Sequence, residues 1–101
     1  MLSQDQIDTY RRAGFIVVEG VLSAAEVSVL RDVTDSFVER ARSVTEHDNV
    51  FDLEPSHTPE DPRIRRIKTP LAHHAVYDGV MRNPAILRIL QQLIGSAIRF
   101  V

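Results

Sequence analysis

The stretch YRRAGFIVVEGVLSAAE, residues 10–26, sets the order of the first elements of the fold. Gly14 can adopt the left-handed conformation that ends a helix. Residues 15–18 (FIVV) are apolar at every position, which is typical of a strand covered on both faces. Ser23 and Glu26 stand three residues apart and form a capping box that begins a new helix. The stretch therefore predicts a helix, a strand and a second helix with almost no loop between them.

Two helices flank this short strand. The first begins at another capping box, Ser3 with Gln6, and is expected over residues 4–13. The second is expected over residues 24–43, because apolar residues recur there every three or four positions while charged residues occupy the opposite side.

Residues 45–62 are polar and contain three prolines, which predicts a long loop with a short extended piece at 50–53. Residues 63–68 (RIRRIK) are expected to be extended, with either a β-bulge or a short twisted edge, because their two isoleucines stand three positions apart instead of two. Helices are expected over residues 71–82 and 84–94, the second introduced by an Asn-Pro pair. These elements together make the fold class α+β.

The last five residues, 97–101 (AIRFV), alternate apolar and charged side chains as a strand does. A chain that ends inside an apolar strand leaves the hydrogen-bonding edge of that strand unpaired. We therefore expect residues 1–101 to form a single domain or the N-terminal fragment of one, truncated within an incomplete sheet. Its exposed edge strand would allow self-association.

Composition excludes several classes of function. Hydrophobic residues make up 44% and charged residues 26%, as in ordinary soluble domains. The formal net charge of −2 argues against a nucleic-acid partner. The absence of cysteine excludes disulfides, thiolate nucleophiles and cysteine-based zinc sites. No apolar run approaches the ~20 residues that cross a bilayer, and no signal peptide is visible. We expect a cytoplasmic protein with no membrane partner.

The histidines do not predict a metal site. None of His47, His57, His73 and His74 is followed two residues later by a carboxylate, so the His-x-Asp or His-x-Glu pair of non-heme iron enzymes is absent. His74 and Asp78 are four apart and could share one face of a helix, but a solvated helix pair is the more ordinary interpretation. We expect no metal ligand and no catalytic residue in this chain.

One basic cluster occurs in the sequence, and two interpretations of it remain open. It could receive a carboxylate or phosphate, or it could be a solvated edge strand whose charges prevent aggregation, and the second is favoured. Glu54, Glu60 and Asp61 are close enough in sequence to neutralise it. The cluster consists of Arg63, Arg65, Arg66 and Lys68.

The order and spacing of these motifs resemble the N-terminal third of the phytanoyl-CoA dioxygenase family, the iron(II)/2-oxoglutarate oxygenases. The resemblance covers nearly all of the chain and is lowest in the loop at 45–62. The residues that carry it are Leu2-Ser3-x-x-Gln6-Ile7-x-x-Tyr10-Arg11-x-x-Gly14-Phe15-Ile16-Val17-Val18-x-Gly20-Val21-Leu22-Ser23, then Glu26-Val27, Leu30-Arg31, Ile67-Lys68, Asn83-Pro84-x-Ile86-Leu87, Leu93-Ile94-Gly95 and Ile98-Arg99-Phe100.

The resemblance implies a double-stranded β-helix, or jelly roll, that hydroxylates a small-molecule substrate with iron(II) and 2-oxoglutarate. In that family the iron is held by His-x-Asp and a distant second His, on strands that would follow Val101. The chain alone is therefore expected to be inactive and to bind neither cofactor stably, so its status as an enzyme stays open. One position carries over: Lys68 resembles the family's lysine near 2-oxoglutarate, the only cofactor-binding residue we expect here.

A second hypothesis treats the 101 residues as a complete, non-catalytic module. Its unpaired final strand would then pair with the sheet of a partner, as in binding and assembly modules that work by strand addition.

Overall fold

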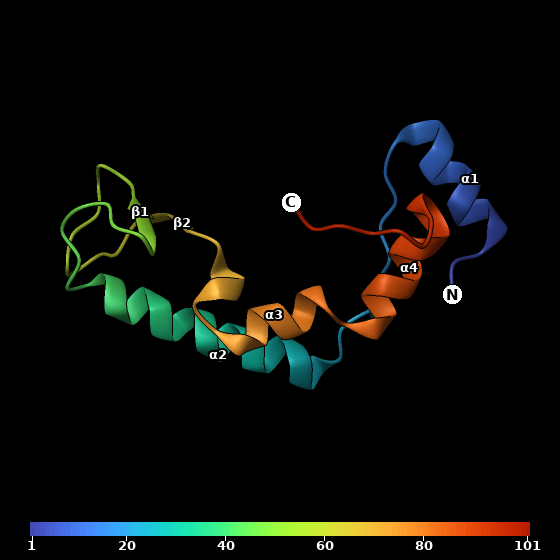
Figure 1. The fold of residues 1–101 in the computed structure, drawn as a ribbon. Coiled ribbons are helices and arrows are strands. Elements are labelled where there is room, and N and C mark those ends of the chain that lie inside the picture. Colours follow the sequence, from blue (N-terminus) through green and yellow to red (C-terminus); the bar gives the residue numbers. More distant parts are fainter. The chain divides into compact units, whose positions relative to one another are not determined.

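A computed structural model describes residues 1–101 (Figure 1). The chain divides into two compact units. The first joins Met1–Leu22 with Val80–Val101, and the second is Ser23–Gly79. Helices and a two-stranded antiparallel sheet make the fold class α+β, as predicted. The expectation of one domain is not tested by this division and stays a prediction. The elements in chain order are α1 (Gln4–Ala13), α2 (Ala24–Ala41), β1 (Phe51–Leu53), β2 (Ile64–Ile67), the 3-10 helix η1 (Pro70–Ala72), α3 (Ala75–Met81) and α4 (Pro84–Ile94).

In the first unit, α1 has the predicted bounds because both of its ends are capped. The hydroxyl of Ser3 accepts a hydrogen bond from the Gln6 N–H, and the Gln6 side chain accepts one from the Ser3 N–H. Gly14 follows with φ of 86°, in the left-handed region, and its N–H donates to the carbonyl of Tyr10. A complete capping box and a left-handed glycine therefore fix both ends of this helix.

Helix α4 also has its predicted bounds and packs against α1 in the same unit. The Asn83 side chain accepts hydrogen bonds from the Ala85 and Ile86 N–H groups, as an N-cap does. The Leu2 N–H donates to Gln92 Oε1 at 2.9 Å, and only 8% of Leu2 is exposed. Leu2 and Gln92 thus tie the start of the chain to α4.

Two predicted strands, 15–18 and 97–101, are wrong. Both segments lie outside any helix or strand, and their backbone groups make no hydrogen bonds to other backbone groups. Large apolar side chains are exposed in both, including Phe15, Val17 and Phe100. A strand exists only when a neighbouring strand pairs with it, and residues 1–101 place no such neighbour beside either segment. Apolar sequence alone did not determine the structure here.

In the second unit, α2 begins at Ser23 as predicted, through a complete capping box with Glu26. The helix ends at Ala41, two residues before the predicted end at 43. The Arg42 and Ser43 N–H groups reach back only three residues, to Glu39 and Arg40, so the chain tightens there and leaves the helix. The predicted range of α2 is therefore wrong only at its C-terminal end.

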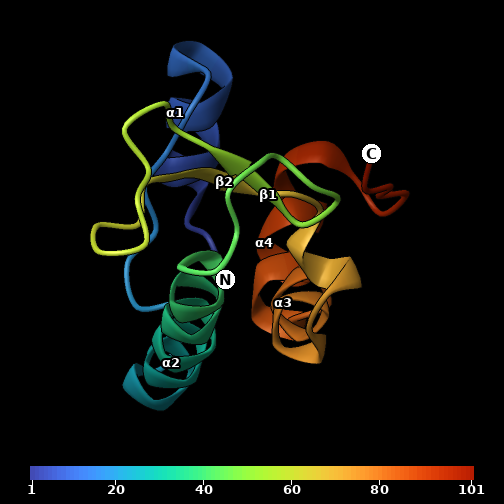
Figure 2. The ribbon, with the colours of Figure 1, turned by 90° about the vertical axis from the view of Figure 1, so that its left-hand side faces the viewer.

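The β1–β2 hairpin lies beyond the C-terminal end of α2 (Figure 2). The predicted loop at 45–62 thus contains a strand where a short extended piece was expected. Phe51 pairs with Ile67 and Asp52 with Arg66, and then the register shifts so that Leu53 pairs with Ile64. Of the two alternatives that the spacing of the isoleucines left open, this register shift favours the bulge.

The prediction of one continuous helix over residues 71–82 is wrong. The segment is divided into η1 and α3. Thr69 precedes η1 with φ of 43°, and His73 and His74 lie between the two helices. His74 Nδ1 accepts a hydrogen bond from the Val76 N–H at 3.0 Å, so His74 caps the start of α3. A side chain that bonds to the backbone in this way favours a helix boundary over a continuous helix.

A small core holds the second unit together. It contains Phe37 and Ala41 from α2 with Phe51 and Leu53 from β1, all of them buried. Helix α3 lies alongside α2 (Figure 1), where Tyr77 packs on Phe37 and shares a 2.7 Å hydroxyl hydrogen bond with Thr34. The core therefore fixes the base of the hairpin. None of the helices is long and apolar enough to cross a membrane.

Candidate functional site

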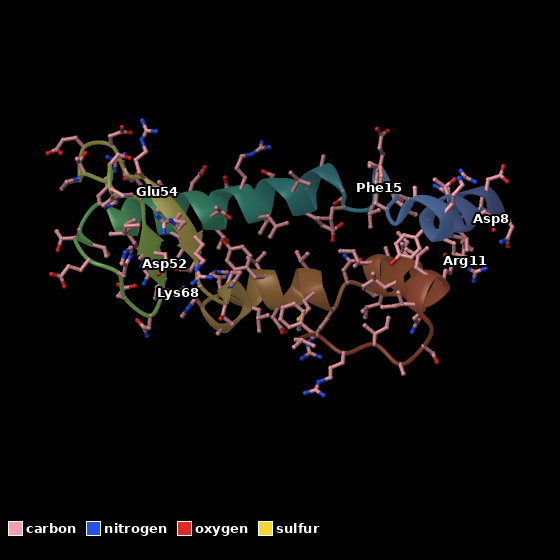
Figure 3. The ribbon with its side chains drawn as sticks, turned by 90° about the horizontal axis from the view of Figure 1, so that it is seen from above. Asp8, Arg11, Phe15, Asp52, Glu54 and Lys68 are labelled. Atoms are coloured by element: carbon pink, nitrogen blue, oxygen red, sulfur yellow. The ribbon has the colours of Figure 1, made fainter.

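A cluster of opposite charges occupies the β1–β2 hairpin (Figure 3). Lys68 Nζ lies 3.0 Å from Asp52 Oδ1 and donates to the carbonyl oxygen of Asp48 at 2.6 Å. The guanidinium of Arg66 contacts the other oxygen of Asp52. We refer to Asp48, Asp52, Arg66 and Lys68 as the hairpin charge cluster. It contains Lys68, the residue that the sequence singles out.

Strand pairing creates this cluster. Side chains alternate along a strand, so Phe51 and Leu53 enter the core and Asp52 between them points to the opposite face. Asp52 pairs directly with Arg66, and cross-strand neighbours on one face lie close enough for an ion pair. The Lys68 N–H donates to the Val50 carbonyl at 2.7 Å, which continues the pairing beyond β2.

The Asp52 side chain is only 15% exposed, whereas 31% of the Lys68 side chain and 68% of the Arg66 side chain are exposed. Hydrogen bonds from Lys68, and then from Arg66, hold the pKa of Asp52 below its usual value. Asp52 is therefore ionised at neutral pH and sits between two cations.

Asp48 shapes the turn that enters β1. One oxygen of its carboxylate accepts hydrogen bonds from the Phe51 and Val50 N–H groups, at 2.7 and 2.8 Å. These two backbone bonds, chiefly the one from Phe51, lower the pKa of Asp48. The side chain thus fixes the backbone of the turn, and the Asp48 carbonyl is left to accept from Lys68.

The side chains of His47 and His57 both form hydrogen bonds with backbone groups. His57 Nε2 lies 3.0 Å from the carbonyls of Ala41 and Val44, at the end of α2, while its Nδ1 accepts from the Arg63 N–H. His47 Nδ1 accepts from the Leu53 N–H at 2.9 Å. Both histidines border an open cavity of about 560 Å³, also lined by Glu54 and Arg65. Their hydrogen bonds give them structural roles in the hairpin.

Residues 1–101 do not fit an iron ion. No group of three or more histidine, aspartate and glutamate side chains lies close enough to hold a metal. His74 precedes α3, and its Nδ1 accepts a hydrogen bond from the Val76 N–H, so His74 lies outside the helix that contains Asp78. A catalytic metal needs several protein ligands converging on one point, and this chain supplies none of that geometry.

The rest of the basic cluster is neutralised by neighbours that the sequence indicated in part. Arg65 pairs with Glu54 at 3.2 Å and Arg63 with Asp61 at 3.0 Å, and the first pair raises the pKa of Arg65. Asp52, the partner of Arg66 and Lys68, was not predicted from the sequence. Its signal is the pattern Phe-Asp-Leu, in which one charge stands between two apolar residues.

Comparison with known proteins identifies the family. The model of the phytanoyl-CoA dioxygenase (PhyH) family matches residues 10–100. No curated protein and no solved structure matches this chain. The family match covers almost the whole chain and agrees with the motifs in its sequence. The chain therefore belongs to the phytanoyl-CoA dioxygenase family.

Proposed function

We propose that residues 1–101 form the N-terminal part of an iron(II)/2-oxoglutarate-dependent hydroxylase that acts on a small molecule. The family match over residues 10–100 is the observation that carries this proposal. Members of the family generally depend on iron and 2-oxoglutarate. The expected full fold is a jelly roll, whose remaining strands would come from outside these residues.

Within this proposal, Lys68 binds a carboxylate of 2-oxoglutarate. Its side chain is 31% exposed at the end of the β1–β2 pairing, where a solute can reach it. A lysine ammonium recognises a carboxylate as a compact charge with several donors. When iron and 2-oxoglutarate are bound, they supply the oxidising chemistry, and Lys68 contributes orientation of the co-substrate.

The iron would have to be held by residues outside 1–101, because the described chain brings no three ligands together. We expect no succinate when this chain alone is supplied with iron(II), 2-oxoglutarate and oxygen. Succinate formation that increases with protein concentration would contradict the proposal that the iron ligands lie elsewhere.

Binding of 2-oxoglutarate tests the role of Lys68. Equilibrium dialysis should detect weak binding by the wild-type chain and a loss of at least about fivefold in Lys68→Met, since a charge-assisted hydrogen bond disappears. Arg63→Met removes a neighbouring cation that is already paired with Asp61 and serves as the matched control. Equal binding by wild type and Lys68→Met would overturn the assignment.

A second candidate function is an assembly module. Phe15, Val17 and Phe100 are between 67% and 76% exposed, and their segments carry unpaired backbone groups. Such segments can add to the sheet of a partner, including a second copy of the chain. Sedimentation at increasing concentration separates the alternatives. A concentration-dependent dimer that dissociates in Val17→Lys supports assembly, whereas a monomer up to millimolar concentration counts against it.

A further inference from the structure

We propose that Asp52 positions the ammonium of Lys68, so that one N–H of Lys68 is left to bind a carboxylate. The inference rests on the proposed function for the identity of that carboxylate, which would be 2-oxoglutarate. Its geometric part stands on the hairpin charge cluster alone. Asp52 itself touches no ligand in this scheme and acts through Lys68.

The Lys68 ammonium has more hydrogen-bond donors than its two protein acceptors use. An ammonium carries three N–H groups. One donates to the Asp48 carbonyl at 2.6 Å, and another faces Asp52 Oδ1 at 3.0 Å. The third is therefore available, and partial exposure of the Lys68 side chain makes it reachable. Two acceptors define its direction, because they fix the ammonium of an otherwise flexible side chain.

The carboxylate of Asp52 is held in place by its neighbours on both strands. Its side chain is 15% exposed, and Phe51 and Leu53 on either side are buried in the core. Arg66 on the paired strand contacts the second carboxylate oxygen. The carboxylate is thus oriented from both sides, and its depressed pKa keeps it charged. A fixed anion is able to position the mobile cation of Lys68.

The positive and negative charges of the hairpin charge cluster balance each other. Asp48 and Asp52 carry two negative charges, and Arg66 and Lys68 carry two positive ones, so the cluster has no large excess charge to attract an anion. Long-range attraction is therefore weak, and recognition depends on the directed N–H of Lys68. This makes the position of the ammonium, and hence Asp52, important for a carboxylate ligand.

Lys68 is the only lysine in the chain, which makes a direct test possible. Lysine-selective ¹⁵N labelling gives a single side-chain ammonium signal. In wild type, exchange of its protons with water should be slow because two acceptors hold them. In Asp52→Asn we expect exchange to accelerate about two- to fivefold, as for loss of a partly exposed ion pair.

The matched control is Glu54→Gln, which removes the neighbouring ion pair with Arg65 in the same hairpin. It should leave the Lys68 ammonium unchanged. The Lys68 backbone N–H bonds to Val50, so its hydrogen exchange reports strand pairing separately. Faster ammonium exchange in Asp52→Asn with unchanged backbone protection supports positioning. Unchanged ammonium exchange, or equal acceleration in Glu54→Gln, would overturn it.

Dialysis with 2-oxoglutarate then separates this inference from the proposed function. If both hold, Asp52→Asn should weaken binding about two- to fivefold while Glu54→Gln binds as wild type. If Asp52→Asn releases the ammonium but wild type binds no 2-oxoglutarate, the co-substrate role of Lys68 is wrong and the positioning by Asp52 is supported. Binding that is unchanged in Asp52→Asn contradicts the importance of positioning.

Discussion

Asp48 and Asp52 stabilise the hairpin more when they are ionised than when they are protonated. Backbone N–H groups surround the first carboxylate, and Lys68 and Arg66 contact the second. These contacts differ from those of the apolar core, because their strength depends on the protonation state of the two carboxylates. At the scale of single residues, the hairpin is therefore sensitive to acid.

The pKa values of Asp48 and Asp52 are lowered from 3.8 in the folded state. Each carboxylate therefore contributes stability above its unfolded pKa, and that stability is lost as the pH falls through the folded pKa. We expect the free energy of unfolding to be flat near neutral pH and to fall below about pH 4. Chemical denaturation at a series of pH values measures this.

Asp52→Asn should make the acid part of that profile shallower, because one of the responsible groups no longer titrates. Glu60→Gln is the control, because Glu60 accepts a hydrogen bond from Arg42 through its backbone carbonyl, which the substitution does not change. A profile that is equally steep in Asp52→Asn and wild type would show that Asp52 does not contribute.

Thr34 and Tyr77 join α2 to α3 through one 2.7 Å hydrogen bond between hydroxyl groups. Thr34→Val and Tyr77→Phe should each destabilise the protein by about 1 kcal/mol, because the remaining half-buried hydroxyl loses its partner. The double variant should cost less than the sum of the two. Denaturation of all four proteins gives the coupling energy, and strictly additive effects would contradict the bond.

Single residues also show what the sequence could and could not predict about the site. Lys68 was singled out by its resemblance to a lysine of the family, and Glu54, Glu60 and Asp61 were expected to neutralise its neighbours, of which Glu54 and Asp61 form ion pairs. Asp52 was missed because its contact with Lys68 depends on which residues of the two strands pair, and a bulge shifts that register. Sequence distance does not reveal such a pairing.

Among the elements, helix ends were predicted well because their signals are local. A capping box or a left-handed glycine needs only its own few residues, and α1 and α4 have the expected bounds. Strands at 15–18 and 97–101 were wrong because a strand needs a partner from elsewhere. The helix over 71–82 was divided by the backbone bond of His74, which a hydrophobic pattern does not report.

Gly14 and Gly79 form a matched pair for testing helix geometry, since an added Cβ would have open space at both. Gly14 has φ of 86°, so Gly14→Ala should destabilise the protein by about 1 kcal/mol through backbone strain. Gly79 lies inside α3 without positive φ, so Gly79→Ala should stabilise it by about 0.5–1 kcal/mol. Thermal unfolding distinguishes them, and equal signs would contradict this account.

At the scale of the whole chain, family membership and local geometry give different information: the first concerns the type of reaction, and the second concerns which residues are present to support it. The family match indicates an oxygenase, whereas residues 1–101 bring together no metal ligands. The hairpin charge cluster connects the family match with the local geometry, because it contains Lys68, the one residue expected to contact the co-substrate. Contact of Lys68 with 2-oxoglutarate is therefore the central claim.

The single ammonium signal of Lys68 tests that claim most directly. On titration with 2-oxoglutarate at constant ionic strength, the account predicts a saturable shift of this signal and slower exchange of its protons. Sodium chloride at the same ionic strength should produce neither change. A signal that stays in place across the 2-oxoglutarate titration, or that moves equally with chloride, would contradict the account.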